Sequence, residues 1–105
     1  MSADRIQALE ALARRRPDDP RLKFGLALEY LNAGRRADGI VALQEYLDSA
    51  DDEGNAWGRL AEALREEGRD EEAREAYRSG VQAALAHGHP TMAEEFQGIL
   101  EDWDR

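Results

Sequence analysis

The segment Asn55-Ala-Trp-Gly-Arg-Leu-Ala-Glu-Ala-Leu-Arg-Glu-Glu-Gly68 repeats the pattern of a segment that lies 34 residues earlier, Arg21-Leu-Lys-Phe-Gly-Leu-Ala-Leu-Glu-Tyr-Leu-Asn-Ala-Gly34. The closing glycines of the two segments align with each other, and Leu26 aligns with Leu60. A fixed period of this length, in which each period holds two helical patterns, indicates a stack of helical hairpins.

Six stretches of the chain carry the apolar spacing of a helix, and no stretch alternates as a strand would. Asp19 is predicted to cap the second helix, and Gly34 and Gly68 are predicted to end helices in the left-handed conformation. Connections of two to five residues make neighbouring helices antiparallel. The sequence therefore predicts an all-α fold with helices over residues 3–16, 20–33, 37–49, 55–67, 70–86 and 91–103.

Length and composition restrict the class of protein. A chain of 105 residues is the size of one domain, and its 18 alanines favour closely spaced helices. Because there is no cysteine, disulfides and thiolate metal sites are excluded. The sequence shows neither a signal peptide nor an apolar run of membrane-spanning length, so we expect a cytoplasmic protein.

The net charge of −9 is distributed unevenly along the chain. Residues 1–36 hold eight basic and five acidic residues, whereas residues 37–105 hold six basic and eighteen acidic ones. Such an acidic surface repels nucleic acid, so we expect neither a nucleic-acid nor a membrane partner. Solubility is the simplest reason for the charge, and adaptation to a saline cytoplasm is an alternative.

The two aligned segments carry the motif of a known family, most completely in the second. That segment and the helix after it hold the large and small apolar residues of the motif at Trp57, Leu60, Ala61, Leu64, Gly68, Ala73 and Tyr77. The chain resembles a tetratricopeptide repeat protein of the small bacterial type. The first segment matches at Leu26, Ala27, Tyr30 and Gly34, but has Lys23 in place of the tryptophan and Gly39 in place of the alanine.

The resemblance implies a domain organisation. Residues 1–105 form a single tetratricopeptide domain, with repeat one at 20–53 and repeat two at 54–87. Residues 3–16 are a degenerate half-repeat, and residues 91–104 are a capping helix. The proline that usually closes a repeat is absent from the ends of both full repeats, where Asp51 and Leu85 stand. By the motif, Trp57 is expected in the core, and Trp103 is expected to be less buried.

In this family the first helix of each repeat lines a concave groove that takes a peptide or helix of a partner protein. The resemblance places ten residues in that groove: Arg21, Phe24, Leu28, Leu31, Asn32, Asn55, Gly58, Glu62, Arg65 and Glu66. Some relatives bind a terminal carboxylate with lysine and asparagine there. We reject this function because other residues occupy such positions: Phe24, Leu28, Gly58 and Glu62. Phe24, Leu28 and Leu31 are either an apolar anchor site or buried against a neighbouring helix.

Two further groups of residues have both a functional and a structural interpretation. The basic run Arg14–Arg16, together with Arg21, Arg35 and Arg36, fits either an acidic partner or a solvated helix end, and we favour the second. His87 and His89 flank a glycine, and a turn explains them better than a metal site. No set of residues in the sequence suggests catalysis, a cofactor or a metal.

We therefore expect a non-catalytic interaction module that binds a partner protein on its concave face. The alternative hypothesis is a structural homo-oligomer that assembles through an end helix. A monomer is favoured over a homodimer, and the identity of the partner is beyond the sequence.

Overall fold

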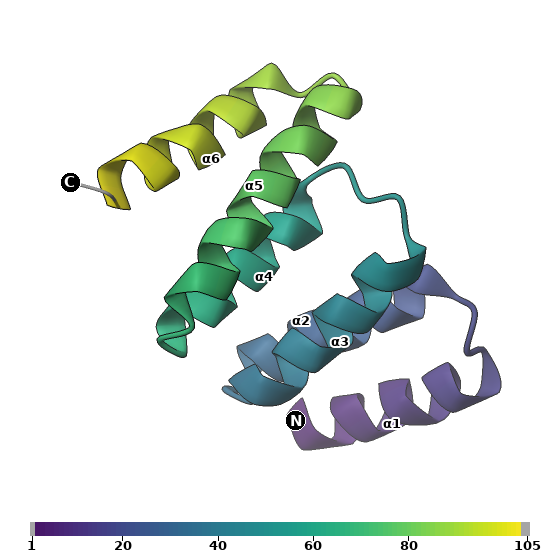
Figure 1. Ribbon diagram of the computed structural model, residues 1–105. Coiled ribbons are helices and arrows are strands. Elements are labelled where there is room, and N and C mark those ends of the chain that lie inside the picture. Colours follow the sequence, from purple (N-terminus) through teal and green to yellow (C-terminus); the bar gives the residue numbers. More distant parts are fainter. Residues whose placement is uncertain (1, 104–105) are drawn as a thin grey trace. The chain divides into compact units, whose positions relative to one another are not determined.

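The computed structural model describes residues 2–103, and this part of the chain contains helices and no strand (Figure 1). The helices are α1 (Ser2–Arg15), α2 (Pro20–Asn32), α3 (Arg36–Ser49), α4 (Asn55–Glu66), α5 (Asp70–Ala86) and α6 (Pro90–Trp103). Each end lies within one residue of its predicted position, and α5 matches its predicted range at both ends. The all-α class predicted from the repeat is confirmed.

The chain forms two compact units, which are described separately. The first unit comprises residues 1–50 and contains α1, α2 and α3. The second unit comprises residues 51–105 and contains α4, α5 and α6. The division into two full repeats, a half-repeat and a capping helix within one domain stays a prediction.

In the first unit, α2 packs against both α1 and α3. Asp19 caps α2 as predicted, because its side chain accepts a hydrogen bond from the backbone N–H of Arg21 at 3.0 Å. The core of this unit is formed by four buried apolar residues: Ile6, Ala27, Ile40 and Leu43. The small side chain of Ala27 allows the helices to approach closely, and the larger residues fill the space between them.

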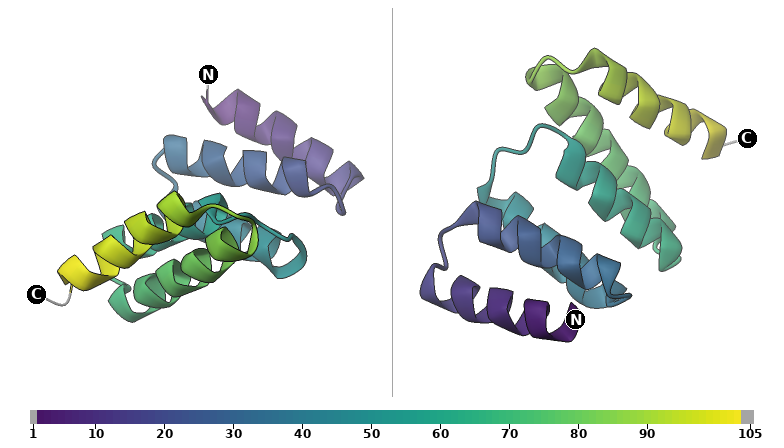
Figure 2. Two further views of the ribbon diagram at one scale, coloured as in Figure 1. Left: turned by 90° about the horizontal axis from the view of Figure 1, so that it is seen from above. Right: turned by 180° about the vertical axis from the view of Figure 1, so that it is seen from behind.

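In the second unit, α5 packs against both α4 and α6 (Figure 2). Six residues of α4 are buried, more than in any other helix: Ala56, Gly58, Leu60, Ala61, Ala63 and Leu64. They face the buried residues of α5, which include Ala73, Ala76 and Tyr77. Five of these buried residues are motif positions, so the motif here specifies helix packing: Leu60, Ala61, Leu64, Ala73 and Tyr77.

The same turn follows three of the helices. Gly34 and Gly68 both have φ of 78°, as predicted, and Gly88 has φ of 76°. After Gly34, the N–H of Arg35 donates to the carbonyl of Tyr30 at 2.8 Å; after Gly68, the N–H of Arg69 donates to that of Leu64 at 2.9 Å. These are the long bonds of a Schellman cap, which needs a residue that tolerates positive φ.

Two apolar residues are less buried than their positions in the sequence pattern predict. Trp57 is half-buried, as is Trp103, so the prediction that Trp57 belongs to the core is wrong. Leu85, which the pattern placed on the apolar face of α5, is 56% exposed. The buried residues of α5 share one side of the helix: Ala73, Ala76, Tyr77, Gly80 and Ala84. At about 100° per residue, Leu85 lies away from the centre of this side.

Candidate binding surfaces

The groove positions predicted on α2 fall into two sets. The Phe24 and Tyr46 rings lie 5.1 Å apart between centroids, and the side chain of Leu31 lies directly over Gly39. Phe24 and Leu31 therefore pack against α3, as one of the two interpretations proposed. Arg21 and Asn32 are exposed, and Leu28 is half-buried.

The contacts of α2 show which of its faces is open. Toward α1, Glu29 forms an ion pair with Arg5 at 2.8 Å, and the Tyr30 hydroxyl donates a hydrogen bond to Glu10. Toward α3, Phe24 and Leu31 are covered. At about 100° per residue, Arg21, Leu28 and Asn32 lie close together on the remaining side of the helix. We call these three residues, Arg21, Leu28 and Asn32, the open face of α2.

The predicted positions on α4 are also divided. Asn55, Glu62 and Glu66 are exposed and lie along one side of the helix; we call them the open face of α4. Gly58 is buried beneath the ring of Phe96 from α6, with an added Cβ only 2.8 Å from Phe96 Cζ. Gly58 therefore offers no surface to a ligand and is removed from the candidate set.

The end of α6 is fixed by aromatic and cationic groups of α4 and α5. The guanidinium of Arg65 lies 3.8 Å from the centroid of the Trp103 ring, and that of Arg74 lies 4.7 Å from it. The Tyr77 ring meets Trp103 edge-on at 6.2 Å. Arg65, predicted for the groove, thus packs on α6, where cation–π attraction of about 0.5–2 kcal/mol is typical. The sequence pattern did not indicate this role because it depends on the docking of α6.

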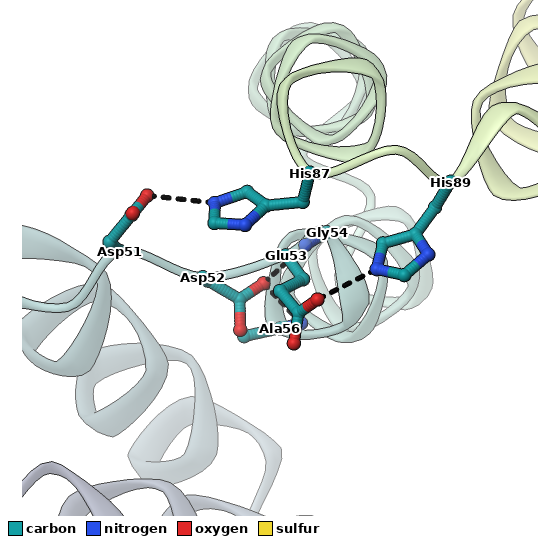
Figure 3. A network of polar contacts seen from close by, with 7 residues as sticks. All are labelled: Asp51, Asp52, Glu53, Gly54, Ala56, His87 and His89. Carbon is teal, nitrogen blue, oxygen red and sulfur yellow. Dashed lines mark hydrogen bonds and ion pairs between the residues drawn. The ribbon is translucent and has the colours of Figure 1, made fainter.

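Two loops of the second unit are joined by a polar network (Figure 3). His87 Nε2 lies 3.0 Å from Asp51 Oδ1, and His89 Nε2 lies 2.7 Å from Glu53 Oε1. Between them, the Asp52 carboxylate accepts hydrogen bonds from the N–H groups of Gly54 at 2.8 Å and Ala56 at 2.9 Å. Asp52 thereby caps α4, whose own N-cap residue is a glycine. The two histidines hold the segment that carries this cap.

A family model described as tetratricopeptide repeat matches residues 1–86 of the sequence. The chain belongs to the tetratricopeptide repeat family.

This tetratricopeptide repeat protein is similar along nearly its whole length to known proteins. It is 29% identical over 100 residues to the TPR repeat-containing protein PA0015 of Pseudomonas aeruginosa, and the match covers 95% of each chain. It also resembles the solution structure of protein BPP2914 from Bordetella parapertussis, with a TM-score of 0.75 and 28% identity. That match covers 92% of this chain and 84% of the other.

Family membership gives the tetratricopeptide repeat protein a general role in protein–protein interaction. The resemblance that the sequence motif indicated is thus confirmed. Among residues 2–103, no helix combines the length and apolar character needed to cross a bilayer. Over the same residues, histidine and carboxylate side chains do not gather in threes as a metal centre would require.

The histidine network should make the stability of this tetratricopeptide repeat protein depend on pH. The hydrogen bond to Asp51 raises the pKa of His87, assisted by the charges of Asp51, Glu53 and Asp52. Because the pKa of His87 is higher in the folded than in the unfolded protein, protonation of His87 stabilises the fold. This stabilisation is fully present below the unfolded pKa of about 6.5 and is lost as the pH rises through the folded pKa. Glu53 behaves in the opposite way: the hydrogen bond to His89 lowers its pKa. The stability that the ionised Glu53 contributes is therefore lost as the pH falls through the folded pKa.

The test is an NMR titration of the His87 ring in the full chain and in Asp51→Asn. In the parent protein the ring should titrate above its ordinary pKa, and in Asp51→Asn the pKa should return toward that value. Melting temperatures should fall as pH rises above about 6.5, and they should fall less in the variant. An identical titration in both proteins would show that Asp51 does not hold His87. Asp48→Asn, an exposed change on α3, is the matched control.

Proposed function

We propose that this protein binds a peptide or helix of a partner protein, without catalysing a reaction, on the first helices of its repeats, α2 and α4. The observation that carries the proposal is the open face of α2. There, the half-buried Leu28 stands beside two exposed polar residues, Arg21 and Asn32, on the side that neither α1 nor α3 covers. An apolar anchor with a polar rim is the usual anatomy of a peptide-binding surface.

The open face of α4 supplies the electrostatic part of the proposal. Its Glu62 and Glu66 are exposed, and the second unit as a whole holds six basic and fifteen acidic residues. We therefore expect a partner that offers one bulky apolar residue to Leu28 and that carries arginine or lysine for the open face of α4. Charges at the rim mainly steer association and are screened by salt, so affinity should weaken modestly as salt rises.

Replacing Leu28 by aspartate should lower the affinity for such a partner about tenfold or more, equivalent to about 1.4 kcal/mol. The change places a carboxylate where the proposal puts the apolar contact. A partner captured from a lysate of the source cell is titrated by calorimetry against the parent and the variant. Arg21→Glu, on the same face but exposed, is a second variant whose folding should be unaffected.

The control is Leu85→Asp, which makes the same chemical change at an exposed position of α5. Its affinity should stay within about twofold of the parent, less than 0.5 kcal/mol. Equal losses in Leu28→Asp and Leu85→Asp would place the binding surface elsewhere. The alternative function, a homo-oligomer joined through an end helix, predicts a dimer in sedimentation at micromolar concentration, whereas the interaction module predicts a monomer.

A further inference from the structure

The first unit contains a cleft of about 490 Å³ that the groove prediction does not include. All three helices of the unit line it, and its apolar floor is formed by Ala13 of α1, Leu26 of α2 and Ala42 of α3. The two alanines leave the hollow because their side chains are too short to fill it. Its volume lies within the roughly 300–1,000 Å³ typical of ligand pockets.

The cleft lies on a different side of α2 from the open face. Its α2 residues, Lys23, Leu26 and Tyr30, recur at helical spacing and lie roughly opposite Leu28 when placed at about 100° per residue. A ligand in the cleft therefore leaves the open face of α2 untouched. The cleft and the open face of α2 are separate surfaces, so the proposal for one can be disproved while the proposal for the other stands.

One wall of the cleft is a fixed pair of polar groups. The Tyr30 hydroxyl donates a hydrogen bond to Glu10 Oε2 at 2.5 Å. Burial, together with this bond to the carboxylate, raises the pKa of Tyr30 to about 12, so the hydroxyl keeps its proton at neutral pH. The Glu10 carboxylate is thus already held by a donor from the neighbouring helix.

The cations of the cleft are not engaged in this way. Arg14 and Lys23 both line it, and over residues 2–103 the side chain of neither makes a hydrogen bond or an ion pair. Arg15 and Arg16 follow directly and are exposed. Glu45 of α3 also lines the cleft and is exposed to water. Arg14 and Lys23 bring two positive charges to the cleft, and Glu10 and Glu45 bring two negative ones. The Glu10 carboxylate already accepts the Tyr30 hydroxyl, whereas the two cationic side chains have no hydrogen-bonding partner in the part of the chain that the structure describes.

We propose that this cleft binds a segment of a partner protein in which a bulky apolar side chain stands next to a carboxylate. The apolar side chain fits against Ala13, Leu26 and Ala42, and the carboxylate lies at the end lined by Arg14 and Lys23. Charge-assisted contacts to arginine and lysine are the stronger class of hydrogen bond.

Three capped peptides test the proposal: acetyl-Gly-Asp-Phe-Asp-Gly-amide, its neutral form with asparagine at both aspartates, and its cationic form with lysine there. Each is titrated into the 15N-labelled full chain at about 20 mM salt, where screening is weak. The amides of Ala13, Leu26 and Ala42 should shift most with the aspartate peptide, whose affinity should exceed that of the neutral peptide at least threefold. Tighter binding of the lysine peptide, equal binding of the neutral one, or no shift at these amides overturns the proposal.

Charge variants of the cleft provide the second test. Lys23→Gln should weaken binding of the aspartate peptide, whereas Glu45→Gln should strengthen it, because one removes a cation and the other removes the competing anion. Both residues are at the surface or half-buried, so both variants should fold. Leu28→Asp, which disables the proposed groove, should leave this titration unchanged. Changes of the same sign in Lys23→Gln and Glu45→Gln would show that these charges do not select the ligand.

Discussion

Truncation of Phe96 to alanine is expected to destabilise the second unit by about 3–5 kcal/mol, the usual cost of removing a core aromatic ring. Phe96 is 9% exposed, and its ring lies against Gly58 of α4, Gly80 of α5 and the Tyr77 ring, whose centroid is 5.6 Å away. Phe96 is therefore, like Trp103, a side chain by which α6 contacts both other helices of the unit. The cavity left by its removal cannot be filled by neighbouring glycines.

Tryptophan fluorescence in a urea titration measures this effect selectively. Both tryptophans of the chain, Trp57 and Trp103, are in the second unit, so their signal follows that unit. Leu85→Ala is the control, because it also removes apolar atoms from this unit but from an exposed side chain, and it should change the free energy of unfolding by less than about 0.5 kcal/mol. A Phe96→Ala loss no larger than that of the control would contradict the role assigned to α6.

The sequence predicted those features that depend on local structure and on the repeat. The helix ends at Gly34 and Gly68 follow from a turn that requires positive φ, and glycine adopts this conformation at the least cost. The cap at Asp19 follows from the short polar side chain before a proline. These requirements act within a few residues, so the sequence pattern alone is sufficient to identify them.

The candidate site was harder to predict, because helical spacing gives the face of a residue but not what covers that face. Gly58 has the position of a groove residue, yet Phe96 lies over it. Leu31 has such a position as well, yet Gly39, which replaces the alanine of the motif, lets it pack closely on α3. The pairing of His87 with Asp51, 36 residues apart, depends in the same way on loops brought together by packing.

Glycine-to-alanine substitutions beneath Phe96 are the second large effect. Within a helix, alanine is more favourable than glycine by about 1 kcal/mol, so helix propensity alone predicts stabilisation. At Gly58 the new Cβ would lie 2.8 Å from Phe96 Cζ, and at Gly80 it would lie 2.9 Å from Phe96 Cε2 and 3.2 Å from Trp57 Cβ. The aromatic ring is rigid and enclosed from both sides, so we expect Gly58→Ala and Gly80→Ala each to destabilise by about 1–3 kcal/mol.

The control for this effect is Gly98→Ala in α6, where an added Cβ meets nothing within 4 Å. It should stabilise the second unit by about 0.5–1 kcal/mol, as propensity predicts. A double-mutant cycle identifies the cause: in a Phe96→Leu background the cost of Gly58→Ala should shrink, because the smaller side chain leaves room for the new methyl group. If Gly58→Ala stabilises the parent as Gly98→Ala does, or if its cost is the same in both backgrounds, Phe96 is not the group that requires glycine here. Glycine at these two positions is therefore best understood as a requirement of α6 docking, which the motif of a single repeat does not contain.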